Sequence, residues 1–215
     1  PIRLNRSLLS YSRDEEAGRR VRVRGVVTLH WPGQALFVQD ESGGLQVQSD
    51  HTPSLKVGDV IEAVGFPAQG GYTPSLKNAI VRQVSTGATL RPSVVTAETA
   101  LSGSHDKDLV ETTGELLALN EELPGRKTLV LQQGKTVFHT FLQTPSDGSI
   151  GSTTYPIGSR LAITGVCSVG VDENGKPVSF TVWMRSPTDV SVLQSPKWWT
   201  LGHVMPAVAG LGLVF

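Results

Sequence analysis

The chain has 215 residues, enough for one large domain or two small ones. Its 19 lysines and arginines are balanced by 19 aspartates and glutamates, which excludes a global field that would draw it to nucleic acid or to an anionic lipid surface. The single cysteine excludes an intramolecular disulfide, and 23 glycines and 13 prolines with few aromatic residues indicate an all-β protein with many turns.

The first predicted elements are a short helix and a series of strands. Ser12 and Glu15 have capping-box spacing, so we expect a short helix that begins there and ends at Gly18. Apolar and polar residues then alternate, which predicts half-buried strands with one side facing a core. Leu36, Val38, Leu45 and Val47 are expected to point inward. The strands expected in this half are Val21–Val27, Leu36–Gln39, Leu45–Gln48, Lys56–Gly65 and Ala79–Val84.

The second half repeats the first. Thr96–Leu101, stopped by Gly103, is the second predicted short helix, and the strand patterns return in the same order behind it. The repeat is about a hundred residues long, too long for a solenoid, and indicates an internal duplication. The aligned segments are Val21–Val27 with Val110–Leu116, Leu36–Asp40 with Leu129–Gln133, Lys56–Gly65 with Pro156–Gly165, and the closing strands Ala79–Val84 with Asp189–Leu193.

Five short strands with these turn glycines are typical of a small Greek-key barrel, the OB-fold. Asn174-Gly175 adds a strong signal for a type I′ hairpin in the second copy. We therefore predict an all-β chain of two tandem OB-fold-like five-stranded barrels, each preceded by a short helix. The expected boundaries are a first barrel at 1–85, a linker at 86–95, a second barrel at 96–194 and a C-terminal segment at 195–215.

The C-terminal segment predicts contact with a membrane. Trp198 and Trp199 precede an apolar run from Val204 to Phe215, and tryptophan favours the headgroup region of a bilayer. The run is shorter than the roughly 20 residues that a spanning helix needs, so it would be the start of a transmembrane helix. A hydrophobic tail that packs on the protein body is the alternative.

Three motifs carry a resemblance to known families: Val21-Arg-Val-Arg-Gly-Val-Val-Thr28, Leu36-Phe-Val-Gln-Asp-Glu-Ser-Gly-Gly-Leu-Gln-Val47 and Val57-Gly-Asp-Val-Ile-Glu-Ala-Val-Gly65. The first copy resembles nucleic-acid OB modules, including the anticodon-binding barrels of class II aminoacyl-tRNA synthetases. Nearly the whole chain, with Trp198-Trp199-Thr200, resembles the extracytoplasmic region of bacterial membrane-bound sensor histidine kinases and related diguanylate cyclases. The second resemblance implies a ligand- or partner-sensing input domain of a signal-transduction protein. It also implies a cell-membrane location, with the domain facing the periplasm or exterior.

Candidate ligand-binding residues gather on the outward face of the first barrel and its loops. Cations, amides and aromatic rings on one face suit recognition of a small ligand, a partner protein or a single strand of nucleic acid. A solvated face, or one covered by the second barrel, remains open as an alternative. The candidates are Arg22, Arg24, Trp31, Phe37, Gln39, Gln46, Gln48 and Tyr72.

Three residues of the second copy predict a contact surface. Trp183 points outward from a strand whose other side is apolar, and His139 and Phe141 lie on a strand with apolar groups on both faces. They would meet the first barrel, the N-terminal segment or another subunit, so a homodimer is also considered.

No catalytic residues, metal or cofactor are predicted, because the five histidines lack metal-ligand spacing and no nucleophile or phosphate-loop motif occurs. We expect no enzymatic activity in this chain. The main expectation is a sensing domain that binds a small ligand or a protein and contacts the membrane, with nucleic acid not expected as a partner. The alternatives are a nucleic-acid-binding protein that uses the first barrel with Arg22 and Arg24, and a structural spacer that dimerises.

Overall fold

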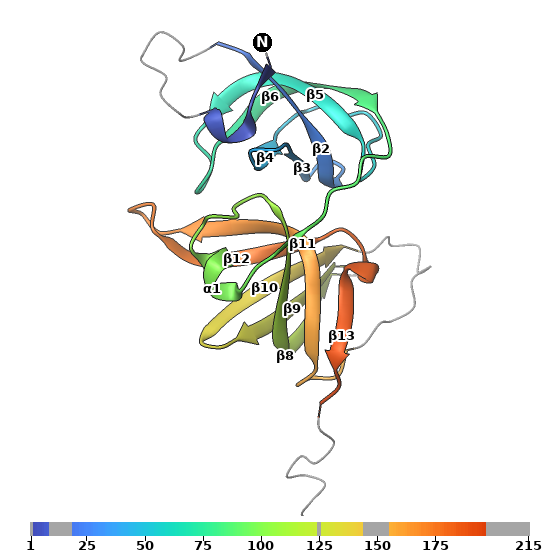
Figure 1. The fold of residues 1–215 in the computed structure, drawn as a ribbon, viewed down its shortest axis with the longest axis vertical. Helices are drawn as coiled ribbons and strands as arrows, with labels where there is room; N and C mark the ends of the chain where they lie inside the picture. Colours follow the sequence, from blue (N-terminus) through green and yellow to red (C-terminus); the bar gives the residue numbers. More distant parts are fainter. Residues whose placement is uncertain (1, 9–18, 124–125, 144–154, 197–215) are drawn as a thin grey trace, which may run out of the picture.

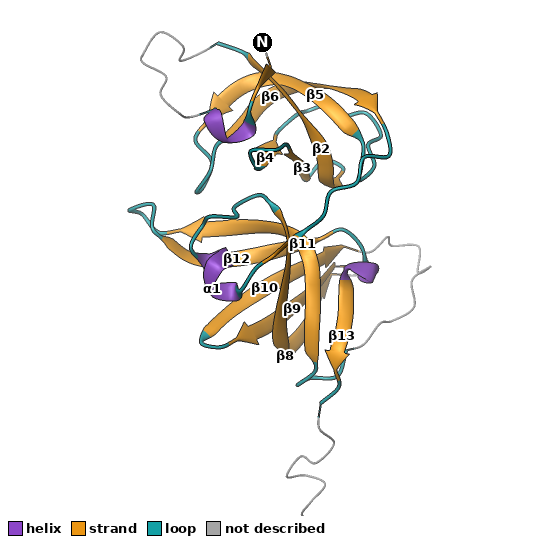
Figure 2. Cartoon of the chain, in the orientation of Figure 1, coloured by secondary structure: helices purple, strands orange, loops and turns teal. Residues whose placement is uncertain are grey.

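The computed structural model describes residues 2–8, 19–123, 126–143 and 155–196. They form two closed β-barrels, one following the other along the long axis of the molecule (Figure 1), with only short helical segments between the strands (Figure 2). The prediction of an all-β chain with two five-stranded OB-like barrels is confirmed, and each barrel is mixed rather than purely antiparallel.

The five main strands of the first barrel pair in a closed ring. β2 pairs antiparallel with β3 on one side and with β5 on the other, and a parallel pair between β4 and β6 completes the ring. A short strand, β1 (Ile2–Arg3), adds to β2, and a 3₁₀ turn follows at Asn5–Ser7. The barrel strands are β2 (Val21–Trp31), β3 (Ala35–Gln39), β4 (Gly44–Val47), β5 (Val60–Ala68) and β6 (Ser75–Ser85).

The second barrel has the same order of pairing. β8 pairs with β9 and β11, and a parallel pair between β10 and β12 closes it. The short strands β7 (Ser93–Val94) and β13 (Val190–Gln194) extend its edges, and a 3₁₀ turn lies at Pro187–Asp189. The barrel strands are β8 (Leu109–Leu123), β9 (Arg126–Gln133), β10 (Thr136–Gln143), β11 (Arg160–Val171) and β12 (Pro177–Met184).

One strand correspondence predicted from the duplication is wrong. β6 closes the first barrel by parallel pairing with β4, and its counterpart in the second barrel is β12, which pairs parallel with β10. β13, which contains the segment aligned with β6 from the sequence, pairs only with the beginning of β11 and extends an edge. Both strands have suitable alternation, so the pattern alone does not distinguish them.

The duplication itself appears in the backbone of matching turns. The Gly58 N–H donates to the carbonyl of Val27 at 2.9 Å, and the Gly158 N–H donates to that of Leu116 at 2.8 Å. Both glycines have positive φ, +91° and +84°, which L side chains rarely adopt. The two copies therefore use glycine at the same turn for the same reason.

The predicted hairpin in the second copy forms, but its turn is of another type. Gly175 has φ +75° whereas Asn174 does not have a positive φ, so the type I′ turn, which needs positive φ at both positions, is excluded. Asp172 donates its N–H to the Lys176 carbonyl around a three-residue loop that places glycine in the left-handed region.

Each barrel encloses its own core of aliphatic residues. In the first, the alternation of β3 and β4 places Leu36, Val38, Leu45 and Val47 inside as predicted. The second core is built around stacked Phe138 and Phe180, whose ring centroids are 4.8 Å apart. Because these side chains point into the cores, the opposite faces of the same strands are the ones that can contact solvent, a ligand or the other barrel.

The two predicted short helices have different outcomes. The second is confirmed as α1 (Ala97–Leu101), with the Thr96 hydroxyl accepting the N–H of Thr99 as its N-cap. The first, at 12–18, lies outside the described residues, as do Trp198, Trp199 and the apolar run behind them. Within the part of the chain that the structure describes, no helix has the length and hydrophobicity to cross a membrane.

Candidate functional site

Aromatic side chains on the outward face of the first barrel contact the second barrel. The Trp183 ring of β12 lies 5.0 Å from Trp31, 6.1 Å from Phe37 and 5.6 Å from Phe141, measured between ring centroids. Trp31 and Phe37 are only 6% and 2% exposed. Two of the predicted ligand-binding rings are therefore covered by the second barrel, and a ligand could stack on them only if the barrels separated.

A polar loop forms the second half of this contact. The connecting loop, defined as Ser104–Asp108, leads from α1 into β8 and carries three buried charged residues. Asp106 accepts the N–H and hydroxyl of Thr73 from the first barrel and the N–H of Val169 from the second. Its carboxylate therefore holds the two barrels together by charge-assisted hydrogen bonds.

Asp108 makes a second set of cross-barrel bonds. It accepts the N–H of Gly44 at 2.7 Å and the Arg6 guanidinium at 2.8 Å, both from the first barrel. The next backbone N–H, of Leu109, donates to the Gln39 side-chain oxygen at 2.7 Å. Gln39, predicted as a ligand contact, is thus occupied by the connecting loop.

Lys107 lies between the two carboxylates and compensates part of their charge. Its ammonium is 3.3 Å from Asp106, donates to the Ser168 hydroxyl at 2.7 Å, and lies 5.9 Å from the centroid of the Phe37 ring. Its φ of +67° is uncommon for a residue other than glycine. Contacts from both barrels hold this backbone in place.

The glycine turn of the first barrel is shaped by the same contact. A Cβ on Gly44 would overlap the carbonyl of Lys107, and it would lie 2.8 Å from the backbone nitrogen of Asp108. Tyr72, another predicted ligand residue, lies against Gly103 and donates its hydroxyl to the Ser102 carbonyl at 3.4 Å, so its ring also faces the second copy.

Three predicted residues do come together, in a cleft at the mouth of the first barrel. The mouth cleft has a volume of about 200 Å³ and lies between the β2–β3 turn, β4 and the loop that follows β4. The residues that line it with polar or aromatic groups are His30, Trp31, Gln34, Gln46, Gln48 and Asp50.

The side-chain amides of the mouth cleft have no hydrogen-bond partner within the described part of the chain. The His30 ring is fixed, because Nδ1 lies 3.1 Å from the Leu55 carbonyl and Nε2 lies 3.2 Å from the Thr52 hydroxyl. The side chains of Gln34 and Gln48 are exposed, and that of Gln46 is half-buried. The cleft thus offers several hydrogen-bond donors and acceptors around a rigid ring.

A second exposed surface, the arginine face, covers the outer side of β2, β5 and β6. Two rows of residues cross these three strands. One row consists of Arg22, Val64 and Ile80, and the other of Arg24, Glu62 and Arg82. The Arg20 guanidinium lies 5.2 Å from the Phe66 ring centroid. The members are Arg20, Arg22, Arg24, Glu62, Val64, Phe66, Ile80 and Arg82.

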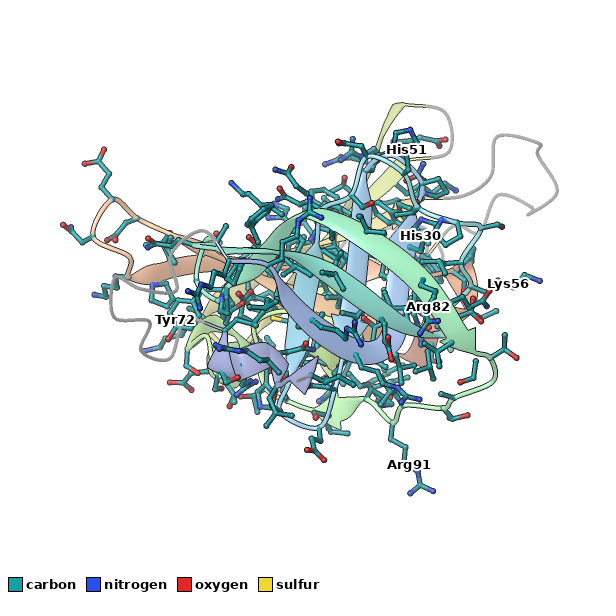
Figure 3. The ribbon with its side chains drawn as sticks, turned by 90° about the horizontal axis from the view of Figure 1, so that it is seen from above. His30, His51, Lys56, Tyr72, Arg82 and Arg91 are labelled. Atoms are coloured by element: carbon teal, nitrogen blue, oxygen red, sulfur yellow. The ribbon has the colours of Figure 1, made fainter. Side chains whose placement is uncertain are left out.

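The charge on the arginine face is strongly one-sided. Glu62 is its one carboxylate and pairs with Arg82 at 3.2 Å. Arg22 and Arg24 are exposed and have no ion-pair partner among the residues that the structure describes. Figure 3 looks onto this end of the molecule, with Arg82 near the middle and His30 and His51 toward one edge.

The three predicted contact residues of the second copy are divided. Trp183 and Phe141 pack into the inter-barrel aromatic cluster, and the Arg126 guanidinium lies 5.5 Å from the Phe141 ring centroid. His139, two residues earlier on β10, is exposed and takes no part in that cluster.

Cys167 lies beneath the connecting loop. Burial, together with the charges of Asp106 and Asp108, raises the pKa of its thiol from 9.0 to about 12, although the Lys107 ammonium acts in the opposite direction. It is therefore a protonated core residue at neutral pH. No cluster of three or more potential metal ligands occurs within residues 2–8, 19–123, 126–143 and 155–196.

Several site residues had little or no sequence signal. Asp106, Lys107 and Asp108 are hydrophilic, and their burial depends on the approach of the first barrel. His30 and Gln34 flank the β2–β3 turn, a position that the OB-fold prediction itself could have marked. Arg82 had no signal of its own, because its position opposite Glu62 follows from a strand register with bulges that the sequence does not give.

No family model and no curated protein matches the chain. Among solved structures, it is similar to a replication protein A heterotrimer bound to single-stranded DNA, at 14% identity and a TM-score of 0.35, covering 94% of this chain and 55% of that one. It is also similar to a murine DNA-binding protein bound to double-stranded DNA, at 12% identity, a TM-score of 0.38, and coverage of 82% and 98%. A third is the S. pombe Stn1–Ten1 complex, at 10% identity, a TM-score of 0.31, and coverage of 60% and 98%.

These comparisons contradict the resemblance to sensor histidine kinases and diguanylate cyclases. The first two of these structures are of proteins bound to DNA, and the main prediction of a membrane-anchored sensing domain is wrong. The expected partners, a small ligand or protein and a membrane but not nucleic acid, are wrong with it. At these identities and TM-scores the likeness concerns the barrel fold, and the ligand has to be argued from this chain's own residues.

Proposed function

We propose that the first barrel binds single-stranded nucleic acid. The observation that carries the proposal is the mouth cleft, where amide side chains converge beside His30 at the β2–β3 turn. In OB-folds an oligonucleotide usually contacts this turn and the face of the second and third barrel strands. Here the second barrel covers that face at Phe37 and Gln39, so the turn and the mouth cleft beside it are the part that remains open.

The chemistry of the mouth cleft suits the edge of one unpaired base. A glutamine amide presents a donor and an acceptor side by side, which match the paired hydrogen-bonding groups of a base edge. Gln34, Gln46 and Gln48 supply three such amides. Because Phe37 and most of the Trp31 ring are buried, recognition here depends on hydrogen bonding more than on extensive stacking.

The arginine face supplies the cations that a phosphate backbone needs. Arg22 and Arg24 are alternate residues of β2, so their side chains on this face are about 6.7 Å apart, and Arg20 directly precedes the strand. Arginine binds phosphate oxygens with bidentate hydrogen bonds. The zero net charge of the chain thus coexists with a local excess of positive charge at this end.

The test is the salt dependence of binding to a fluorescein-labelled oligothymidylate, measured by anisotropy on the whole chain. Each phosphate contact to single-stranded nucleic acid contributes about −0.7 to the slope of log K against log salt. Arg22→Ala/Arg24→Ala should therefore reduce the magnitude of the slope by about 1.4. Gln46→Ala/Gln48→Ala should weaken binding with an unchanged slope, because neutral amides release no counterions.

The matched control is Arg91→Ala/Lys176→Ala, which removes two exposed cations that belong neither to the mouth cleft nor to the arginine face. It should retain the slope and affinity of the unmodified chain. Equal losses in the control and in the Arg22/Arg24 variant, or no saturable binding at low salt, would rule the proposal out.

A further inference from the structure

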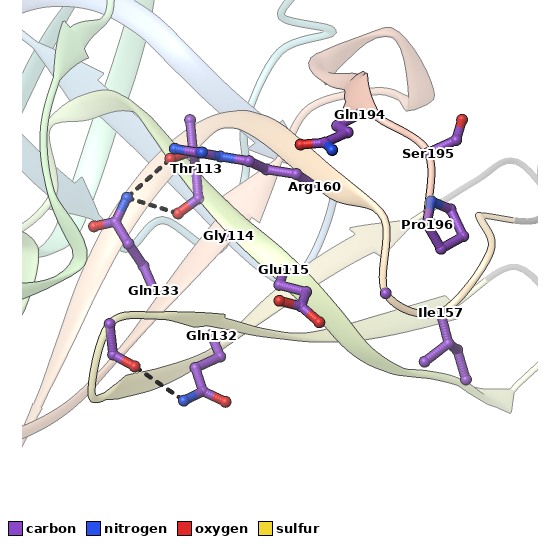
Figure 4. Close-up of a pocket in the computed structure, with 12 residues that line it drawn as sticks. Thr113, Gly114, Glu115, Gln132, Gln133, Ile157, Arg160, Gln194, Ser195 and Pro196 are labelled. Carbon is purple, nitrogen blue, oxygen red and sulfur yellow. Dashed lines mark hydrogen bonds between the residues drawn. The ribbon is translucent and has the colours of Figure 1, made fainter. Parts of the chain in front are cut away.

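The second barrel has a larger cleft that lies apart from the proposed nucleic-acid site. It has a volume of about 620 Å³ and is bordered by β8, the β9–β10 turn, the beginning of β11 and the end of β13. Figure 4 shows it as an open space between two walls, with Gln132 and Gln133 on one side and Gln194, Ser195 and Pro196 on the other. We call it the β13 cleft.

Two opposite charges lie next to each other in the β13 cleft. Glu115 of β8 and Arg160 of β11 are direct cross-strand partners, a position where opposite charges normally pair. Here both side chains are exposed, and neither has an ion-pair partner within the described part of the chain. In Figure 4 the Arg160 side chain reaches toward Thr113, while the Glu115 carboxylate points away from it.

One wall of the cleft is held rigid by hydrogen bonds. The Gln133 amide donates to the carbonyl and the hydroxyl oxygens of Thr113, both at 2.9 Å, and its oxygen accepts the N–H of Ala97 at 2.6 Å. Gln132 donates to the Gly134 carbonyl at 2.9 Å. This wall positions the β9–β10 turn without using Glu115 or Arg160.

We propose that the β13 cleft binds a small zwitterion, such as an α-amino acid or a dipeptide. The Arg160 guanidinium takes the ligand carboxylate by a bidentate pair, and the Glu115 carboxylate takes its ammonium. The exposed aliphatic side chain of Ile157 and the Pro196 ring border the same space and accommodate an apolar side chain.

The lining argues against two other ligand classes. A nucleic-acid backbone would meet a carboxylate for every guanidinium, so it gains no net attraction. A saccharide would find none of the aromatic rings that present a flat apolar surface, because the described lining of this cleft contains none. A ligand with one charge of each sign satisfies both Glu115 and Arg160.

The test is an ¹H–¹⁵N correlation titration of the whole chain with L-alanyl-L-alanine. The matched probe is N-acetyl-L-alanyl-L-alanine amide, which keeps the shape but lacks both charges. We expect saturable shifts of the Gly114, Gly134 and Gly158 amides with the charged dipeptide and none with the blocked one. Arg160→Gln and Glu115→Gln should each weaken binding by roughly tenfold or more, whereas Glu173→Gln in the β11–β12 turn should not change it.

Equal shifts with the blocked dipeptide, or stronger shifts with maltotriose, would overturn the assignment, as would the absence of saturable shifts in the folded protein. Because the probes carry no phosphate and the glycines lie in the second barrel, failure here leaves the proposal for the first barrel unaffected.

Discussion

The substitution Gly44→Ala tests whether the two barrels form one rigid unit. The new methyl group would overlap the carbonyl of Lys107 and crowd the backbone nitrogen of Asp108, and these are main-chain atoms that cannot rotate away. It would also displace the Gly44 N–H from the Asp108 carboxylate. Overpacking costs about 1–3 kcal/mol and a hydrogen bond to a charged group about 1.5–3 kcal/mol, so we expect a loss of about 3–5 kcal/mol from the inter-barrel contact.

The assay combines urea denaturation with ¹⁵N relaxation. The unmodified chain should unfold in one transition and tumble with one correlation time, because the connecting loop ties the barrels together. Gly44→Ala should unfold at lower urea and give shorter correlation times, since each core lies inside its own barrel and survives separation. Gly87→Ala is the control, because its Cβ would touch nothing within 4 Å and its positive φ alone costs roughly 1–2 kcal/mol. An unchanged midpoint and a single slow correlation time in Gly44→Ala would refute the rigid contact.

Three further predictions concern two residues of the same contact and one core residue beneath it. Trp183→Ala should lower the free energy of unfolding by about 3 kcal/mol, whereas Trp183→Phe should lower it by only about 1 kcal/mol, and urea titrations of both variants distinguish the two. Phenylalanine keeps ring contacts and removes a buried indole N–H that has no hydrogen-bond partner among the described residues. Asp106→Asn should cost about 2 kcal/mol and lower Tm in a thermal scan, since the neutral amide weakens the bonds from Thr73 and Val169. Because the pKa of the Cys167 thiol is raised in the folded protein, the unfolded chain loses this proton at lower pH. The free energy of unfolding should therefore fall by about 1.4 kcal/mol per pH unit between pH 9 and 12. Urea titrations over this pH range should show that the contribution is missing in Cys167→Ala.

Much of the fold could be predicted from local pattern. Alternation identified the inward residues of β3 and β4, and the alignment of Lys56–Gly65 with Pro156–Gly165 indicated the duplication before the strand pairing was known. These features depend on neighbours in the sequence or on the period of a strand. The closing strand of the second barrel was missed, because β12 and β13 both alternate and only the long-range pairing with β10 distinguishes them.

Less of the candidate site could be predicted from the sequence. Alternation correctly pointed Phe37 and Trp183 outward, but it does not tell whether an outward ring meets solvent, a ligand or another barrel. Asp106 and Asp108 illustrate the converse case, since charged residues in a loop are normally solvated and here are buried by a tertiary contact. Gln46 and Gln48 were identified as outward amides, while the cleft that brings them near His30 depends on the curvature of the barrel.

The most direct test of the central proposal is an ¹H–¹⁵N correlation titration of the chain with an unlabelled oligothymidylate at low salt. Binding to the first barrel predicts saturable shifts of the Arg22, Arg24, Gln46 and Gln48 amides that diminish when salt is raised, with the amides of β9 and β10 unchanged. Shifts confined to the second barrel, or no shifts at millimolar oligonucleotide, would contradict single-strand binding by the first barrel.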